Sequence, residues 1–508
     1  MNHTRLYSLL ILLLLPSLAF SQGGIGPIVT QVAHANADVG HPNSRIAAGF
    51  GVRAVARGTD ILENPSGSIV TYGRLSDDTA TEPDQNTYVA FDRNPGGPVP
   101  GFDYGRHFLY QGHENGDDLA YITRVNLDVK DPLHHITLLT PVGGDGLTHF
   151  NSIDGSVYNP FTNTLLFTEE DGSAGGVIQV KRSWPPAAST LDGILGRAGY
   201  EGIHVDDQGN LILVEDSGGT AVPVDPNDPN SPKLAKQPNS FVYRFLPYNV
   251  ADISQGGKLQ ALQVSIDGSP VVFHADDPSG DVFSINQLLL HTPGTSYPTQ
   301  WVTVHDTAVD GTDSFDANAA AKAALATPFK RPENMAFMPG SHFQTFFFTP
   351  TGDTDAIAGA EVELAERGTW GSIFRVDLDS DRQTGTISIF FLGDSTHNSF
   401  DNIAFANTQQ IIVTEDRGNT LHTELNTLDS VWAFSINGKI APLRFIALGR
   451  DATSEAEGED NEPTGIDVSA GGSHISDLLG TLAGLFDARA FFTQQHGDNV
   501  TYEIQQRF

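Results

Sequence analysis

Short apolar strands that end in acidic residues recur along this chain. The clearest copy is segment 200–205, YEGIHV, in which Glu201 opens an alternating strand; a Gly-Asn turn follows, and the apolar run 211–216, LILVED, closes on Glu215 and Asp216. Alternating apolar and polar positions on both sides of a short turn predict a β-hairpin. Glu201 and Glu215 are 14 residues apart (215 − 201), so we expect the two ends of this hairpin to lie at the same level.

A second copy, with Asp401 and Glu415 at the matching positions, has the same separation of 14 residues (415 − 401). Weaker copies of the pattern occupy 106–127, 155–171, 331–353 and 462–498, and amphipathic strands follow several of them, at 240–245, 372–377 and 430–435. Repeats of this kind predict an all-β protein folded as a β-propeller, with about six blades around a central channel. A large β-sandwich or a parallel β-helix would not explain why acidic residues recur at equivalent strand ends.

Composition agrees with an all-β fold that carries loop insertions. The 508 residues include 52 Gly and 29 Pro, which favour many turns and short strands. The Pro- and Asp-rich segment 225–232 is expected to be a surface loop, the Ala-rich segment 317–326 a short helix, and the acidic stretch 451–462 a solvated loop. We predict one propeller domain over residues 22–508.

The N-terminus has the pattern of a signal peptide over residues 1–21. Arg5 gives a positive start, 9–15 is an apolar run too short to span a bilayer, and 19–21 (AFS) has the small residues expected before a cleavage site. This pattern predicts export by the general secretory route, to the periplasm or the medium. No later apolar run approaches membrane length, so we expect no membrane contact after cleavage.

Charge and cysteine content exclude several function classes. The formal charge of −34, from 62 acidic and 28 basic residues, argues against a nucleic-acid partner, because phosphate backbones are bound through clusters of Lys and Arg. The chain has no cysteine, which excludes disulfides, thiolate zinc sites and cysteine nucleophiles. A Gly-x-Ser-x-Gly nucleophile motif is also absent from the sequence, so serine-hydrolase chemistry has little support.

The recurring strand-end acids instead indicate a metal site. Blades around an axis would bring these carboxylates together, and clustered carboxylates repel one another unless they bind cations. Calcium takes six to eight hard oxygen ligands, and carboxylates supply them. We expect His113, His204 and His496 to form hydrogen bonds in the channel rather than to bind metal.

An ordered series of motifs from residue 106 to the C-terminus resembles the PhoX-type alkaline phosphatases. The segments that carry the resemblance are His113-Glu114, Asn159-Pro160 through Glu169-Glu170, Tyr200-Glu201-Gly202, Leu213 to Ser217 with Tyr243-Arg244-Phe245, Arg331 to Asn334, Phe400-Asp401-Asn402, and Phe491 to Gly497. Each motif alone is weakly specific, whereas their common order is more specific. The resemblance implies a six-bladed propeller that holds calcium and ferric iron in its channel and hydrolyses phosphomonoesters.

The resemblance also suggests which residues form the site. The candidate metal ligands are Glu114, Asp154, Glu169, Glu201, Glu215, Asp216, Glu333, Asp401, Glu415 and Glu462. The candidate catalytic residues are Arg331 and Arg417, whose guanidinium groups match a phosphate oxygen pair, and Asn402. Calcium is the expected cofactor, and iron is a second one implied by the family.

Two features of the sequence depart from the family pattern. The family places a cysteine thiolate among its iron ligands before the Asn-Pro segment, whereas this chain has Asn151-Ser152-Ile153-Asp154 there, so Asp154 would have to supply an oxygen ligand instead. Family members are exported through a twin-arginine signal, whereas this N-terminus has a lone Arg5. The metals would then be loaded outside the cytoplasm.

The sequence leaves two other function classes open. One is a calcium-dependent lactonase or phytase-like propeller hydrolase, and the other is a non-catalytic propeller that binds a protein or glycan. Exposed aromatic residues at loop tips would favour the second, and the metal content of the purified protein would separate both from a phosphatase. We expect a monomer that acts on a small phosphorylated substrate.

Overall fold

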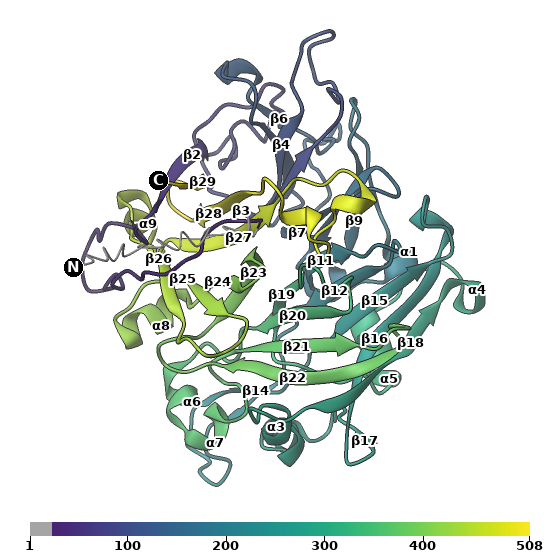
Figure 1. The fold of residues 1–508 in the computed structure, drawn as a ribbon, viewed down its shortest axis with the longest axis vertical. Helices are drawn as coiled ribbons and strands as arrows, with labels where there is room; N and C mark the ends of the chain where they lie inside the picture. The colour runs from purple at the N-terminus through teal and green to yellow at the C-terminus, as the bar shows by residue number, and fades with distance from the viewer. Residues whose placement is uncertain (1–22, 508) are drawn as a thin grey trace, which may run out of the picture.

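Six antiparallel blades surround a central axis in the computed structural model, which describes residues 23–507 (Figure 1). From inner to outer strand, blade 1 is β3 (Glu82–Ala90), β4 (His107–Glu114), β5 (Tyr121–Asn126) and β6 (Ile136–Leu138). Blade 2 is β7 (Ile153–Asn159), β8 (Thr164–Glu169), β9 (Val177–Lys181) and β10 (Ala188–Thr190). Blade 3 is β11 (Tyr200–Val205), β12 (Leu211–Glu215), β15 (Val242–Pro247) and β16 (Gly257–Ile266).

The other three blades have the same plan. Blade 4 is β19 (Pro332–Phe337), β20 (Thr345–Pro350), β21 (Ser372–Leu378) and β22 (Thr384–Leu392). Blade 5 is β23 (Phe400–Asn407), β24 (Gln410–Glu415), β25 (Ser430–Ser435), β26 (Leu443–Ala447) and β1 (Arg45–Ile46). Blade 6 is β27 (Glu462–Ser469), β28 (Arg489–Gln495), β29 (Val500–Gln506) and β2 (Phe50–Ala56).

The inner strands close a ring. Each of β3, β7, β11, β19, β23 and β27 contacts the inner strands of both neighbouring blades, and β27 returns to β3. Blade 6 joins the two ends of the chain, because β2 near the N-terminus pairs with β29 near the C-terminus. The predicted all-β propeller is thereby confirmed, and the number of blades is six.

Apolar side chains pack between the blades and leave the channel polar. Separate clusters of buried residues join blades 1 and 2 around Phe108 and Phe167, blades 3 and 4 around Phe245 and Phe348, and blades 5 and 6 around Phe445 and other apolar residues. Burying apolar side chains contributes about 25 cal/mol per Å² of area removed from water. This packing fixes the inner strands, and with them the side chains that point into the channel.

Short helices and hairpins fill the loops between strands. The helices are α1 (Asp192–Leu195), α2 (Pro278–Val282), α3 (Ile285–Leu290), α4 (Thr307–Asp310), α5 (Ala317–Ala323), α6 (Ala356–Ala360), α7 (Val362–Ala365), α8 (Gly418–Leu425) and α9 (Ala452–Glu457). The 3-10 turns are η1 (Pro132–His134), η2 (Gly172–Ala174), η3 (Ile253–Gln255), η4 (Ile475–Asp477) and η5 (Ala483–Leu485). Helix α5 confirms the predicted Ala-rich helix, whereas α9 forms inside the acidic stretch that was expected to be a loop, with Asp451 as its N-cap.

Blades 3 and 4 share an extra strand at their outer edges. Strand β18 (Tyr297–Asp306) pairs with β16 on one side and with β22 on the other (Figure 1). The remaining strands are β17 (Ser269–Pro270), which pairs with β16, and the hairpin β13 (Ala221–Pro223) and β14 (Lys233–Lys236). Within residues 23–507 no helix has the length and apolar character needed to cross a membrane, and the predicted signal peptide lies outside the described residues.

Candidate metal centre

One end of the channel is an acidic cavity. It has a volume of about 190 Å³ and lies where the inner strands begin and the second strands of the blades end. Its lining residues are Glu82, Asp84, Glu114, Asp154, Glu170, Glu201, Asp216, Arg331, Glu333, Asp401, Asp416, Glu462, Gln495 and His496. All six blades contribute to it.

Strand register decides which acid of each hairpin faces the cavity. Tyr200 lies directly opposite Glu215 in the β11–β12 pair, and residues directly opposite each other share one face of a sheet. Successive residues of a strand point to opposite faces, so Glu201 and Asp216 lie on the other face, toward the channel. The pairs Phe400 with Glu415 and Ile153 with Glu169 have the same register.

The structure brings together most, but not all, of the residues that the sequence predicted. Those that line the cavity are Glu114, Asp154, Glu201, Asp216, Arg331, Glu333, Asp401 and Glu462. Glu169, Glu215, Glu415, Arg417 and Asn402 do not line it. In place of Glu169, Glu215 and Glu415, the next residue in each case, Glu170, Asp216 or Asp416, reaches the cavity.

Glu215 is a structural residue in the core of its blade. Its carboxylate accepts hydrogen bonds from the Tyr243 hydroxyl at 2.8 Å, from the Asn318 amide at 2.7 Å and from the Phe241 backbone N–H at 3.1 Å. Burial raises the pKa of Glu215 to about 8 even though these donors lower it. Glu215 was therefore wrongly included among the metal ligands, whereas its neighbour Asp216, which was also predicted, lines the cavity.

Glu415 and Arg417 pair with each other below the cavity. The Arg417 Nη2 donates to Glu415 Oε1 at 2.7 Å and to the Thr396 carbonyl at 2.8 Å, and both side chains are buried. Within residues 23–507, Arg417 therefore has no path to a substrate in the cavity, which corrects its predicted catalytic role. The pair instead anchors the turn that presents Asp416.

Asn402 supports the site from beneath. Its Nδ2 donates to Asp401 Oδ1 at 2.8 Å, and its Oδ1 accepts from the Thr464 hydroxyl at 3.0 Å and from the Gly465 N–H. Asn402 therefore orients Asp401 and links blades 5 and 6, and it does not itself line the cavity. It is a positioning residue rather than a catalytic one.

His496 lines the cavity and was expected in the channel, whereas several other lining residues were not predicted from the sequence, namely Glu82, Asp84, Glu170, Asp416 and Gln495. Glu170 and Asp416 could have been found from strand alternation, because each follows a Glu whose partner in register is an apolar residue. Glu82 and Asp84 lie on β3, before the first repeat recognised in the sequence. His113 and His204 form the expected hydrogen bonds, to Thr123 and Asn334.

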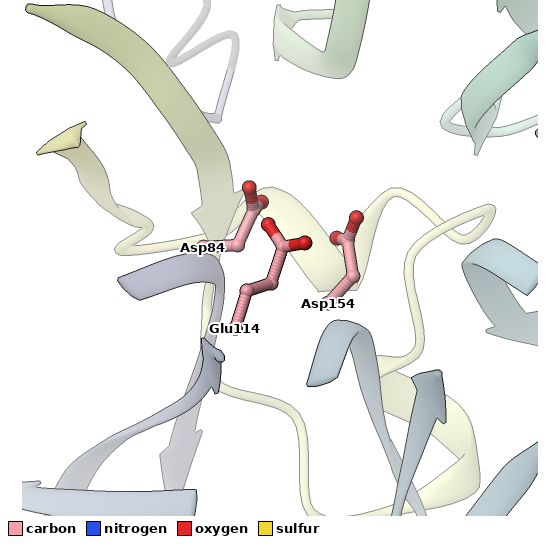
Figure 2. A group of neighbouring side chains, drawn as sticks. All are labelled: Asp84, Glu114 and Asp154. Carbon is pink, nitrogen blue, oxygen red and sulfur yellow. The ribbon is translucent and has the colours of Figure 1, made fainter. Parts of the chain in front are cut away.

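Three groups of three carboxylates could each hold a metal ion. They are Asp84, Glu114 and Asp154; Asp154, Glu170 and Glu201; and Glu201, Asp216 and Glu333, and in each group the ligand oxygens lie within 4.8 Å of one another. Figure 2 shows the first group, with the three carboxylates directed toward a common space. Asp154 belongs to the first two groups and Glu201 to the last two, so the groups form one continuous series.

Arg331 compensates the charges of these carboxylates only in part. Burial raises the pKa of Glu114 and the pKa of Glu201 well above the usual range, and the nearby Asp154 carboxylate adds to this rise. Burial and Asp216 act in the same way on Glu333, and they raise the pKa of Glu170 to about 8. A bound cation would favour the ionised carboxylates and remove this cost.

Arg331 is the arginine of the cavity. Its Nε donates to Asp216 Oδ2 at 2.8 Å, and its Nη2 lies 3.6 Å from Glu333 Oε1. Its φ of 55° is in the left-handed region, which costs a non-glycine residue on the order of 1–3 kcal/mol, and strain of this kind clusters at active sites. Asp216 Oδ1 is buried and has no hydrogen-bond partner in the described part of the chain. An unpartnered buried carboxylate oxygen beside two further acids fits a metal ligand.

Glu169 and Glu170, which are neighbours at the end of β8, allow a test of which residue faces the acidic cavity. We expect Glu170→Gln to lower the metal content of the purified protein, because Glu170 lies in the central carboxylate group. Glu169→Gln is the matched control: Glu169 Oε1 accepts from the Asn151 N–H at 3.1 Å, and the amide oxygen of Gln can keep that bond. Metal analysis of both variants checks the prediction, and equal losses would contradict it.

Comparisons with known proteins give one family and several distant folds. The family model "Alkaline phosphatase PhoX" matches residues 234–469, and no curated protein sequence matches the chain. Similar solved structures include TolB from Acinetobacter baumannii, with 9% identity, coverage of 84% of this chain and 64% of that one, and a TM-score of 0.30. The calcium-binding protein regucalcin from Agrobacterium tumefaciens has 10% identity, covers 70% and 92%, and has a TM-score of 0.27.

Proposed function

We propose that this protein is an exported phosphatase that hydrolyses phosphomonoesters at metals held in the acidic cavity. The match of residues 234–469 to the family model of alkaline phosphatase PhoX supports this proposal. The observation that carries the proposal is the series of three linked carboxylate groups with one arginine in the same cavity. The family match covers Arg331, Glu333, Asp401, Asp416 and Glu462 of that cavity.

Calcium is the metal that this set of donors suits best. Every ligand in the three groups is a carboxylate oxygen, and hard oxygen ligands are those that calcium prefers. Iron(III) also accepts carboxylates, although the thiolate of the family is replaced by Asp154, which the fold directs into the cavity. When bound, the cations would neutralise the cavity and polarise the phosphoryl oxygens for in-line attack.

Hydroxyl groups hold the acids in place for this task. Thr464 donates to Asp84 Oδ1 at 2.7 Å, Thr414 donates to Asp401 Oδ2 at 3.2 Å, and Thr351 donates to Glu333 Oε1. Such supports orient a ligand and reduce the entropy lost when a cation binds. The guanidinium of Arg331 can bind a phosphate oxygen while Asp216 fixes its direction.

The proposal extends to the substrate, the oligomeric state and the cellular location of the protein. A phosphomonoester carries about two negative charges near pH 7, so its entry into a cavity with one arginine requires bound cations. We propose a small phosphorylated substrate, a monomeric protein and export by the general secretory signal. Nucleic acid is disfavoured as a partner by the net charge of −34.

A reconstitution assay tests the proposed activity. We expect the metal-loaded protein to hydrolyse a chromogenic phosphomonoester only when calcium is present, and Glu201→Gln to serve as the inactive control because Glu201 belongs to two carboxylate groups. Without a thiolate ligand, turnover is expected to be slower than in thiolate-bearing relatives. No hydrolysis above that control, with calcium alone or with calcium and iron, would reject the phosphatase and favour a binding propeller.

A further inference from the structure

A second hollow lies beside blades 1 and 2, at the ends of their inner strands that are farthest from the acidic cavity. It has a volume of about 410 Å³ and is lined by Asp92, Arg93, Pro160, Asn163, Arg182, Ser473, His474 and Ile475. Asp84 of the acidic cavity and Asp92 of this hollow are eight residues apart (92 − 84) along and just beyond β3. At about 3.3 Å per residue the two sites are separated by roughly 25 Å.

Two arginine side chains place positive charge in the lining of this hollow. Neither Arg93 nor Arg182 forms an ion pair with a carboxylate of residues 23–507, although the chain has 62 acidic residues and 28 basic ones. The Arg182 guanidinium lies over the Phe91 ring, 4.8 Å from its centroid. This cation–π contact holds the side chain in place and leaves the edge of the guanidinium available to a ligand.

The other lining residues favour an anion with an organic part. The one carboxylate of the hollow, Asp92, lies 3.3 Å from the His474 imidazole. Asn163 Oδ1 accepts from the Tyr158 hydroxyl at 3.3 Å, which leaves the Asn163 amide N–H groups as donors. Pro160 and Ile475 add apolar surface. The volume is within the range of small-ligand sites, which is about 300–1,000 Å³.

The negative charge of the whole protein does not prevent anion binding here. The Debye length is about 8 Å at physiological ionic strength, so the acidic cavity at roughly 25 Å is screened. The local field is then set by the two arginines, whose charges exceed that of the single carboxylate, Asp92. Planar guanidinium groups bind phosphate oxygens in pairs, which gives geometry as well as charge.

We propose that this hollow is a second anion site that binds a phosphate group, either free or on a small organic molecule, independently of the metal centre. Arg93 and Arg182 bind the phosphate oxygens, and Asn163 donates a further hydrogen bond. The organic part, where there is one, packs against Pro160 and Ile475.

Calorimetric titration of the metal-loaded full-length protein tests the proposal. The probes are inorganic phosphate and phenylphosphonate, which has no ester bond to hydrolyse. Besides the binding event at the metal centre, we expect a second one that Arg93→Ala with Arg182→Ala weakens at least about tenfold, equivalent to about 1.4 kcal/mol, while hydrolysis at the metal centre keeps its kcat/KM. Tighter binding of phenylphosphonate than of phosphate would assign an organic ligand, and equal binding would assign free phosphate.

Two further variants test whether a loss of binding comes from unfolding or from the removal of any surface arginine. Arg93→Glu changes an exposed residue, so it should remove binding without unfolding the protein, as melting temperature can verify. Arg57→Ala, at another exposed arginine outside the hollow, should change nothing. A second binding event that survives in the double variant, or no binding event beyond the one at the metal centre, would overturn the proposal. Loss of hydrolysis alone would bear only on the phosphatase.

Discussion

We expect chelation of the bound metals to lower the melting temperature. We also expect the melting temperature of the metal-free protein to fall as pH rises from 5 to 8. In the metal-free fold, burial and neighbouring carboxylates raise the pKa of Glu114, Glu201, Glu333, Asp401 and Glu462 well above the usual range, and raise that of Glu170 to about 8. A group whose folded-state pKa is raised stabilises the fold fully below its unfolded pKa. That stability is lost as pH rises through the folded-state pKa.

The size of the effect can be bounded. For Glu170 the window runs from its ordinary value of 4.5 to about 8, and the other acids of the cavity act in the same direction. Each unit of pKa shift corresponds to about 1.4 kcal/mol, so we expect a fall on the order of 5 °C across this range for a chain of this length. Metal that binds only the folded state stabilises it by about 2.7 kcal/mol per site at 100 times its Kd.

Differential scanning fluorimetry with and without a chelator would check this prediction. The control is the same pH series in saturating calcium, where the carboxylates stay ionised and the slope between pH 5 and 8 should flatten. Identical melting curves in chelator and in calcium would contradict a metal centre. A metal-free protein that becomes more stable toward pH 8 would contradict the assigned carboxylate energetics.

The propeller was predictable because each blade repeats the same hydrophobic pattern. Paired copies around Glu201 and Asp401 gave the inner hairpins, and their amphipathic continuations gave β15, β21 and β25. Such patterns follow from burial on each face of a strand, which the sequence records directly. Strand β18, which joins blades 3 and 4, was not predicted, since the pairing of outer edges depends on contacts between distant segments.

The candidate site was predictable to within one residue. Sequence reasoning placed acids at the correct strand ends and included Asp216, but it also included Glu215 and Glu415, which face away from the cavity, and it left out Asp416. The reason is physical: Leu211 to Val214 is apolar at every position, so the pattern does not show which face each residue occupies, and a shift of one residue exchanges the faces of all side chains. Only the pairing of Tyr200 with Glu215 settles which face Glu215 occupies.

The sharing of ligands between the carboxylate groups predicts unequal losses of metal. Glu201 belongs to the second and third groups, whereas Asp84 belongs to the first alone. We expect Glu201→Gln to lose more than one ion per chain and Asp84→Asn to lose about one, because an amide of the same size removes the charge but keeps the packing. Hydrolysis should fall roughly 100-fold or more in Glu201→Gln.

Metal analysis of dialysed protein, together with the phosphomonoester assay, would measure both effects. Asp467→Asn is the matched control: Asp467 is a buried acid on β27 that accepts from the Tyr88 N–H at 3.0 Å and does not line the acidic cavity. It should retain all of its metal, since the Asn side-chain oxygen can accept the same bond. Equal losses from Glu201→Gln and Asp84→Asn would show that the groups bind metal separately, because a shared carboxylate must affect two ions at once.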